Sequence, residues 1–377
     1  MFVTRWRLFR VQGIPLNIDA GWLIILALVS WTLSNFLREI VPGLNGSRYW
    51  ILGLITALTF FVCIVLHELG HALMARRLGI PIRGITLFLF GGVAELEKEP
   101  KSAAGEFIMA IAGPVVSAVL AGLFWLAGAF GAEADWQPIV LAMLSYLSVI
   151  NLFLLVFNLV PAFPLDGGRV FRSFLWGAIG NFRRATHWAA MVGQAFAWFL
   201  MGLGLLNLFA GHFFGGIWLG LIGLYLNRAA QASYQQVVAR EVLQGEPIAQ
   251  FMNPNPVVVP PAVDLYHWVE DYVFRFHDKT YPVASNGKLE GVIATRDLSQ
   301  FPRSEWDLHT VGEAMERDLE PISIRPNADG LQALEQMKRC GSSRLMVTEN
   351  GTLKGMVSLK DLLKFLQLKL ELAGEPE

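Results

Sequence analysis

The sequence predicts a polytopic α-helical membrane protein with a membrane-associated β-hairpin, followed by a smaller cytoplasmic α/β domain. Of the 377 residues, 54% are hydrophobic and only 16% are charged, and the mean hydropathy is +0.45. This composition excludes an ordinary soluble protein. The long apolar runs lie before residue 240 and most acidic residues lie after it, which predicts a membrane half and a soluble half. The net charge of −1 provides no basic face, so we expect no nucleic-acid partner.

Six apolar segments predict transmembrane helices, because about 20 apolar residues let a helix cross the hydrocarbon core of a bilayer. They cover residues 19–37, 49–78, 104–130, 138–160, 186–208 and, in a shorter run, 214–227. No small-residue cleavage site follows the first of them, so we expect no cleavable signal peptide. Cys63 and Cys340 fall in different halves of the chain, so we expect no disulfide framework.

Residues 80–97 interrupt the helical pattern and predict a β-hairpin or a re-entrant segment. Their apolar part, residues 85–90, is too short to span the bilayer and is rich in strand formers. Irregular backbone at membrane depth is tolerated only where it is buried in protein or lines a wet cavity. This segment is therefore a candidate wall of an active site, although Gly91 and Gly92 alone would more often mark a simple turn.

The positive charges predict the orientation in the membrane. One set of loop flanks carries Arg5, Arg7, Arg10, Arg76, Arg77, Arg83, Lys98, Lys101, Arg169, Arg172, Arg183, Arg184, Arg228 and Arg240, and the other set carries only Arg38 and Arg48. The positive-inside rule therefore places both termini and the soluble domain in the cytoplasm, and the protein in the inner or plasma membrane. The same topology puts His67, His71 and Asp166 toward the cytoplasmic ends of their helices.

The second apolar segment contains His67-Glu68-Leu69-Gly70-His71, which predicts a metal site. Histidines at i and i+4 lie one turn apart on one helix face, so both imidazoles can reach one metal ion. The glutamate between them can hold a water against that metal and take its proton. The alternative is a histidine pair that is hydrogen-bonded to neighbouring helices, but ionisable groups in a membrane segment more often mark a functional site.

A zinc hydrolase needs three protein ligands and an open position, and Asp166 is the best candidate for the third ligand. It is the only acid in an apolar stretch, residues 158–169, where two prolines and two glycines break the helix. The alternative for Asp166 is an N-cap of a short helix from about Val170 onward.

The soluble half contains an internal repeat, which predicts two copies of one small α/β module packed together. Each copy has a helical stretch, residues 265–276 or 330–340, and then a glycine-led strand that begins at Gly291 or Gly355. We expect a membrane domain over residues 1–230, a linker over 231–245, modules over 246–303 and 304–370, and a tail over 371–377.

The histidine motif, followed about 90 residues later by Asn158-x-x-Pro161-x-x-Pro164-Leu165-Asp166-Gly167, resembles the intramembrane site-2 protease family over roughly residues 1–230. The resemblance implies that His67, His71 and Asp166 bind one zinc ion per chain and that Glu68 is the general base. It also implies that Asn158 positions the substrate or its oxyanion, and that Gly91 and Gly92 lie on a strand that pairs with an unwound substrate segment. Asn158 could instead bond an adjacent helix. Many relatives carry Asn where this chain has Ser117, so the role of Ser117 stays open.

The repeat resembles a pair of cystathionine-β-synthase (CBS) domains, so the fold class is a membrane-helical domain plus a tandem CBS domain. Such pairs bind adenine nucleotides through a Gly-x-x-Ser/Thr-x-x-Asp motif. The second copy keeps this motif as Gly355, Ser358 and Asp361, whereas the first copy has Asp297 but Ala294 in the hydroxyl position. The resemblance therefore favours one functional nucleotide site over two. The alternative is a purely structural module for homodimerisation.

We therefore expect an intramembrane zinc metalloprotease that cuts single-span membrane proteins, such as anti-sigma factors or signal-peptide remnants, in or near their transmembrane segments. The CBS pair is expected to dimerise the enzyme and to bind an adenine nucleotide that regulates it. The alternatives from other classes are a transporter or channel with a CBS regulator, and a catalytically inactive scaffold.

Overall fold

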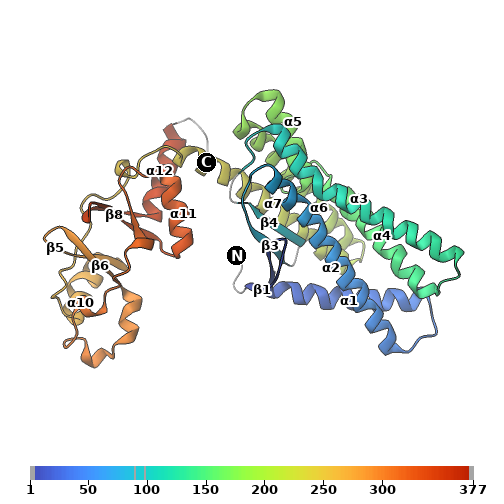
Figure 1. The fold of residues 1–377 in the computed structure, drawn as a ribbon, viewed down its shortest axis with the longest axis horizontal. Coiled ribbons are helices and arrows are strands. Elements are labelled where there is room, and N and C mark those ends of the chain that lie inside the picture. The colour runs from blue at the N-terminus through green and yellow to red at the C-terminus, as the bar shows by residue number, and fades with distance from the viewer. Residues whose placement is uncertain (1–4, 89–90, 97–98, 373–377) are drawn as a thin grey trace. The chain divides into compact units, whose positions relative to one another are not determined.

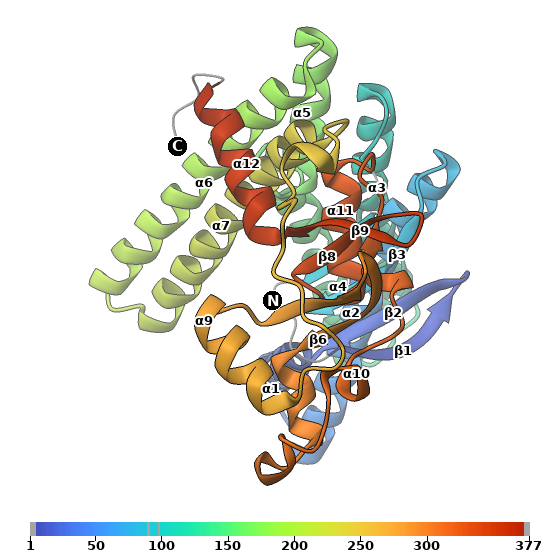
Figure 2. The same cartoon turned by 90° about the vertical axis from the view of Figure 1, so that its left-hand side faces the viewer.

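The computed structural model describes residues 5–88, 91–96 and 99–372. Residues 89–90 of the predicted hairpin, Lys98 and most of the predicted tail lie outside this description. The chain divides into two compact units, residues 1–235 and 236–377, and each is described by itself (Figures 1 and 2).

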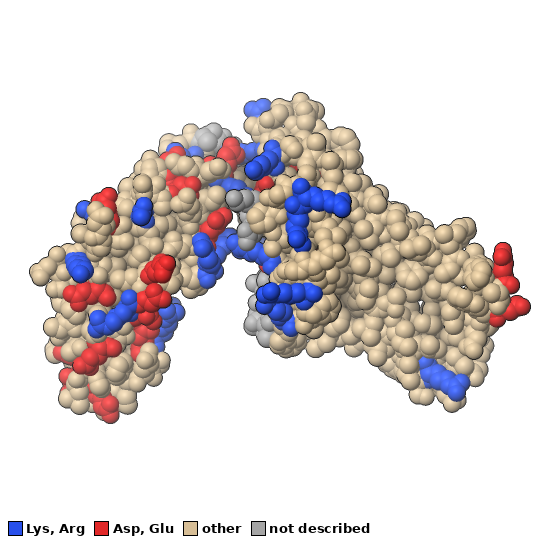
Figure 3. Space-filling view, viewed as in Figure 1, with Lys and Arg blue, Asp and Glu red and all other residues tan. Residues whose placement is uncertain are grey.

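Six helices of the described chain are long and apolar enough to cross a membrane, as the sequence predicts. They are α1 (Ala20–Ile40), α2 (Gly46–Arg77), α3 (Ala103–Glu133), α4 (Pro138–Asn158), α6 (Phe182–Phe209) and α7 (Phe213–Leu243). Helices pair all backbone groups internally, which the hydrocarbon core requires. The face of this unit in Figure 3 shows a broad band without charged side chains. The helix α7 is longer than predicted and includes most of the expected linker, residues 231–245.

A four-stranded sheet packs against α2, in the order β1-β2-β3-β4. Its strands are β1 (Arg5–Val11), β2 (Ile14–Asp19), β3 (Ile82–Phe88) and β4 (Gly91–Leu96). The pair β3 and β4 is antiparallel, within the segment predicted to form strands. Its association with the membrane stays a prediction. Because β4 is an outer strand of this order, one of its edges has no partner strand among the described residues.

Before α1, β1 and β2 form an antiparallel hairpin. Gln12 and Gly13, at its turn, both have positive φ angles of 49° and 82°, a backbone that suits two-residue hairpin turns. The alternating Ile14, Leu16 and Ile18 are 4%, 3% and 5% exposed and join the core that α2 contributes to. The hairpin is therefore held by burial of one face of β2, which also pairs in parallel with β3.

Glycines shape the connection between α4 and the short helix α5 (Asp166–Ile179). A Cβ on Gly167 would lie 2.3 Å from the Leu159 carbonyl oxygen, and one on Gly168 would lie 2.4 Å from the Phe163 nitrogen. On α6, a Cβ on Gly193 would lie 2.2 Å from the Phe163 carbonyl oxygen. Residues 159–165 therefore pack closely between the first turn of α5 and the middle of α6, and this packing sets where α5 begins.

The second unit contains a five-stranded sheet in the order β5-β6-β9-β8-β7. Its strands are β5 (Thr280–Ser285), β6 (Lys288–Ala294), β7 (Ser323–Ile324), β8 (Arg344–Glu349) and β9 (Thr352–Ser358). Its helices are α8 (Leu265–His267), α9 (Phe274–Phe276), α10 (Val311–Ala314), α11 (Gly330–Cys340) and α12 (Leu359–Leu372), with a π-helical turn over Trp268–Val273 and 3₁₀ turns at Ile248–Gln250, Thr295–Gln300, Arg303–Glu305 and Glu320–Ile322.

The predicted internal repeat is visible in this unit. The antiparallel pairs β5–β6 and β8–β9 each end in the same kind of turn. Asp297 accepts a hydrogen bond from the Ala294 N–H at 2.8 Å, and Asp361 accepts one from the Ser358 N–H at 2.9 Å. An aspartate that bonds the backbone three residues before it holds the start of the turn that follows the strand in both copies.

We predict that Gly193→Ala destabilises the membrane unit by about 1–3 kcal/mol, because the added methyl group must displace the Phe163 backbone. Gly202→Ala on the same helix is the matched control, since nothing lies within 4 Å of its added Cβ. Alanine in that open helical position is expected to stabilise slightly. Thermal unfolding of the detergent-solubilised variants measures both effects. Equal unfolding temperatures of the Gly193→Ala and Gly202→Ala variants would contradict the close packing around residues 159–165.

Candidate functional site

Three ligand-type side chains converge between α2 and α5. The distances are 3.0 Å from His67 Nε2 to Asp166 Oδ2, 3.2 Å from His71 Nε2 to the same oxygen, and 3.2 Å between the two Nε2 atoms. Two ligands at the usual zinc distance in a tetrahedral arrangement are about 3.3 Å apart. The triangle therefore has the dimensions of one face of a zinc coordination tetrahedron. The structure brings together the three residues that the sequence singled out as candidate ligands.

Helix geometry explains how these side chains meet. His67 and His71 lie one turn apart on the buried face of α2, and are 3% and 5% exposed. Asp166 is the first residue of α5, and Leu165, not Asp166, occupies the N-cap position. The alternative of Asp166 as an N-cap for a helix from Val170 onward is therefore wrong, and its carboxylate faces the imidazoles.

The outer nitrogens of both imidazoles are held by α3. His71 Nδ1 donates to the Met109 carbonyl oxygen at 2.8 Å, and His67 Nδ1 lies 2.8 Å from Ser117 Oγ. Because a carbonyl can only accept, the proton of a neutral His71 sits on Nδ1 and its Nε2 keeps a lone pair. Partners of this kind fix the ring orientation of metal-binding histidines. Ser117, whose role the sequence left open, is the partner of His67.

Gly113 of α3 keeps the space in front of the imidazoles open. A Cβ on this residue would lie 2.2 Å from His71 Nε2 and 2.6 Å from His67 Nε2. Zinc–nitrogen bonds are about 2.0–2.1 Å long, so a side chain here would occupy the space that a cation needs. On α2, Gly70 permits the same close approach, since its Cβ would lie 3.0 Å from the Ala112 carbonyl oxygen. The sequence contained one weak signal for Gly113, which is that a glycine lies within an apolar span.

These residues fit a bound divalent cation. The inner Nε2 lone pairs and the Asp166 carboxylate are all acceptors, and they face one another in a buried setting. Acceptors at this distance repel unless a proton or a cation lies between them, and buried charges are normally paired or coordinate metals. The donor set of two imidazoles and one carboxylate suits zinc.

The structure places Glu68 next to strand β4. A Cβ on Gly92 would lie 2.7 Å from Glu68 Cγ, and the backbone of Ala94 also faces the Glu68 carboxylate. Gly92 is therefore required for close packing of the strand against the glutamate. Gly91 has a φ of 134° and open space around its Cβ position, so it is required for its backbone conformation and remains compatible with a simple turn.

Asn158 is the last residue of α4 and is half-buried. The alternative of a bond to an adjacent helix stays open. Its predicted contact with the substrate or oxyanion stays a prediction.

The predicted nucleotide residues lie at the two repeated turns of the second unit. Ser358 Oγ lies 2.6 Å from Asp361 Oδ2, where β9 meets α12. Asp297 occupies the equivalent turn after β6, without a hydroxyl beside it at position 294. The difference between the two copies that the sequence showed is thus retained in the geometry.

Comparison with known proteins places the site in a family. The profile of peptidase family M50 matches residues 55–133 and 128–200, and that of the CBS domain matches residues 311–368. A candidate zinc metalloprotease of Synechocystis sp. is 35% identical over 94% of this chain and 93% of its own length. A zinc metalloprotease of Methanocaldococcus jannaschii is 31% identical over 97% of this chain and 98% of its own length.

Among solved structures, the site-2 protease from Methanocaldococcus jannaschii is 33% identical, with a TM-score of 0.44, and the match covers 61% of this chain and 94% of that chain. The relatives that match over nearly the whole chain and the profile that matches over the histidine motif indicate the same family. The chain therefore belongs to peptidase family M50, as a zinc metalloprotease of the site-2 protease type that also carries a CBS domain.

Proposed function

We propose that this protein hydrolyses peptide bonds in or near the transmembrane segments of single-span proteins, at a zinc site formed by His67, His71 and Asp166. The observation that carries the proposal is the triangle of three buried acceptors in front of Gly113, with Glu68 on the same helix. A zinc ion bound there supplies a Lewis acid and lowers the pKa of a coordinated water to about 7.

The protein's own residues supply the remaining chemistry. Glu68 follows His67 directly on α2 and is the proposed general base that takes a proton from the attacking water. Met109 and Ser117 hold the imidazoles so that their inner nitrogens stay directed at the centre. The amide of Asn158 is proposed to stabilise the developing oxyanion, an effect of about 3–4 kcal/mol in a soluble protease.

Strand β4 is the proposed docking edge for the substrate. A transmembrane helix hides its peptide bonds in its own hydrogen bonds, so it must unwind before it is cut, and its freed groups must be paired again. The outer edge of β4 can pair with an extended segment by β-addition. The closeness of Gly92 to Glu68 would bring such a segment beside the proposed base.

The setting in the cell follows from the charge distribution. The arginine-rich flanks support a multi-pass protein of the inner or plasma membrane with both termini and the CBS region in the cytoplasm. The substrate class is single-span membrane proteins, of which anti-sigma factors and signal-peptide remnants are examples. Homodimerisation through a tandem CBS pair is part of the same proposal.

A regulatory site for an adenine nucleotide is proposed at the second repeat. Ser358 and Asp361 lie within hydrogen-bonding distance of each other at one turn, where the serine could bond a phosphate and the aspartate the ribose hydroxyls. The alternative is a structural dimerisation module. Isothermal titration with ATP, ADP and AMP, on wild type and Asp361→Ala, separates the two: binding lost in the variant supports the regulatory site, and no binding to wild type supports the structural module.

We predict that Glu68→Gln keeps its zinc but cleaves a single-span test substrate about 10²–10⁴-fold more slowly, because the proton acceptor is lost and the ligands are not. The control is Glu133→Gln at the exposed end of α3, which should cleave like wild type. Zinc analysis and gel-based cleavage measure the two properties. Equal cleavage by Glu68→Gln and wild type would contradict the role of Glu68, and absence of zinc from both would favour the transporter alternative.

Gly113→Ala is expected to lose most of its bound zinc while remaining folded, because the methyl group takes the space in front of the two Nε2 atoms. Gly122→Ala on the same helix meets no atom within 4 Å and should retain zinc. Zinc content per chain after gel filtration is the measurement. A Gly113→Ala protein with wild-type zinc content would show that the cation does not sit between the histidines and α3.

A further inference from the structure

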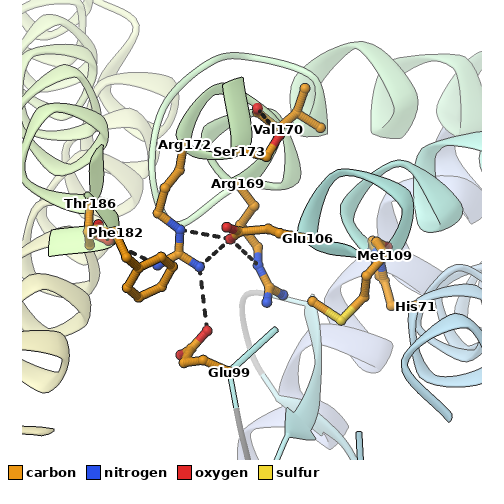
Figure 4. A network of polar contacts seen from close by, with 10 residues as sticks. All are labelled: His71, Glu99, Glu106, Met109, Arg169, Val170, Arg172, Ser173, Phe182 and Thr186. Atoms are coloured by element: carbon orange, nitrogen blue, oxygen red, sulfur yellow. Dashed lines mark hydrogen bonds and ion pairs between the residues drawn. The ribbon is translucent and has the colours of Figure 1, made fainter. Parts of the chain in front are cut away.

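A buried ion pair joins α5 to α3. Arg172 Nε donates to Glu106 Oε1 at 2.7 Å, and Arg172 Nη2 bonds the same oxygen. The two side chains are 3% and 0% exposed. Charged side chains are almost never fully buried unless they are paired. Figure 4 shows the guanidinium pointing at the carboxylate.

Two aromatic rings and a threonine surround the Arg172 guanidinium. Its guanidinium carbon lies 4.8 Å from the centre of the Phe163 ring and 4.6 Å from that of Phe182, distances typical of cation–π contacts. Its Nη1 lies 3.4 Å from Thr186 Oγ1 on α6. Phe163 belongs to the connection between α4 and α5, so Arg172 also contacts the segment that leads into Asp166.

The carboxylate is similarly enclosed. Arg169 Nε lies 3.9 Å from Glu106 Oε1, and Glu99 lies 3.5 Å from Arg172 Nη2 at the edge of the cluster. Figure 4 shows Arg169 and Arg172 of α5 both reaching Glu106 of α3. Both guanidinium donors meet Glu106 Oε1, whereas Glu106 Oε2 has no hydrogen-bond partner among the described residues.

The same two helices carry the proposed metal site. Asp166 is the first residue of α5, less than two turns before Arg172. Glu106 is one turn before Met109, whose carbonyl oxygen accepts a hydrogen bond from His71 Nδ1. Gly113 lies one turn after Met109 on the same helix. In Figure 4, His71 and Met109 lie next to the network. The ion pair thus links the helix that supplies the carboxylate to the helix that orients the imidazoles.

We propose that the Arg172–Glu106 pair is a positioning device that holds Asp166 at its place opposite His67 and His71 before the metal binds. The inference rests on the proposed role of these three residues as zinc ligands. Close packing around residues 159–165 sets where α5 begins, and the ion pair adds a direct link from α5 to α3, the helix that orients the imidazoles.

The test is a double variant, Glu106→Gln with Arg172→Met, which removes both buried charges. Arg169 and Glu99 each lose a partner, but their side chains are 21% and 40% exposed. Replacing both partners of a buried pair is often neutral for stability. We expect the metal-free variant to unfold near the wild-type temperature, but to bind zinc about 10–100-fold more weakly, the range seen when groups that orient metal ligands are removed. We also expect an altered visible spectrum of the cobalt-substituted protein and a lower kcat with little change in KM.

The control is Arg184→Met, which removes an exposed arginine near the start of α6 and should bind zinc like wild type. A double variant with wild-type zinc affinity and cobalt spectrum would overturn the inference and leave only a structural role for the pair. If the wild type holds zinc and Asp166→Ala does not, the proposed metal site stands even when the inference fails. If Asp166→Ala retains wild-type zinc affinity, the proposed site itself fails.

A second measurement needs no variant and decides the matter if the double variant does not fold. Hydrogen exchange of the backbone amides of residues 168–173 is compared in the zinc-loaded and chelator-treated wild type. The inference predicts that their protection stays within about threefold when the metal is removed, because the ion pair holds the helix. Loss of protection on metal removal would show that the metal, and not the Arg172–Glu106 pair, positions α5.

Discussion

The buried imidazoles of His67 and His71 impose the main physical constraint on the membrane unit, because a polar group inside an apolar helix bundle needs a partner for each of its atoms. Their outer nitrogens meet this requirement through Met109 and Ser117 of α3. Their inner nitrogens face only each other and the Asp166 carboxylate. A cation between these acceptors would offset their repulsion, and Gly113 keeps the space for it.

The other elements of the membrane unit position the two imidazoles and the residues around them. Gly70 and Gly113 let α2 and α3 approach closely enough for α3 to hold the outer nitrogens and still leave room at the inner ones. Gly167 and Gly168 let the first turn of α5 approach the segment before it, and the Arg172–Glu106 pair ties α5 to α3. The sheet, which packs on α2, brings β4 beside Glu68. Ligands, base and candidate docking edge thus come from elements that pack directly on α2 or α3.

What could be predicted from the sequence was local or compositional. The spacing of His67 and His71 follows from the helical repeat, and the six spans follow from hydropathy. Asp166 stood out as an acid at a helix break. The partners from α3 could not be predicted, because an apolar span does not show which serine or carbonyl meets a histidine 50 residues away. The pairing of β2 with β3 was missed for the same reason, since it joins segments separated by two long helices, α1 and α2. Arg172 was predicted only as one of many loop cations, and its burial depends on Glu106 of a distant helix.

The most direct test of the central claim is X-ray absorption at the zinc edge on the zinc-loaded, detergent-solubilised protein. The account predicts two imidazole nitrogens and oxygen donors at about 2.0–2.1 Å, with no sulfur, in a four-coordinate site. A sulfur donor, which Cys63 or Cys340 would supply, or a spectrum without imidazole scattering would contradict the assignment of His67, His71 and Asp166.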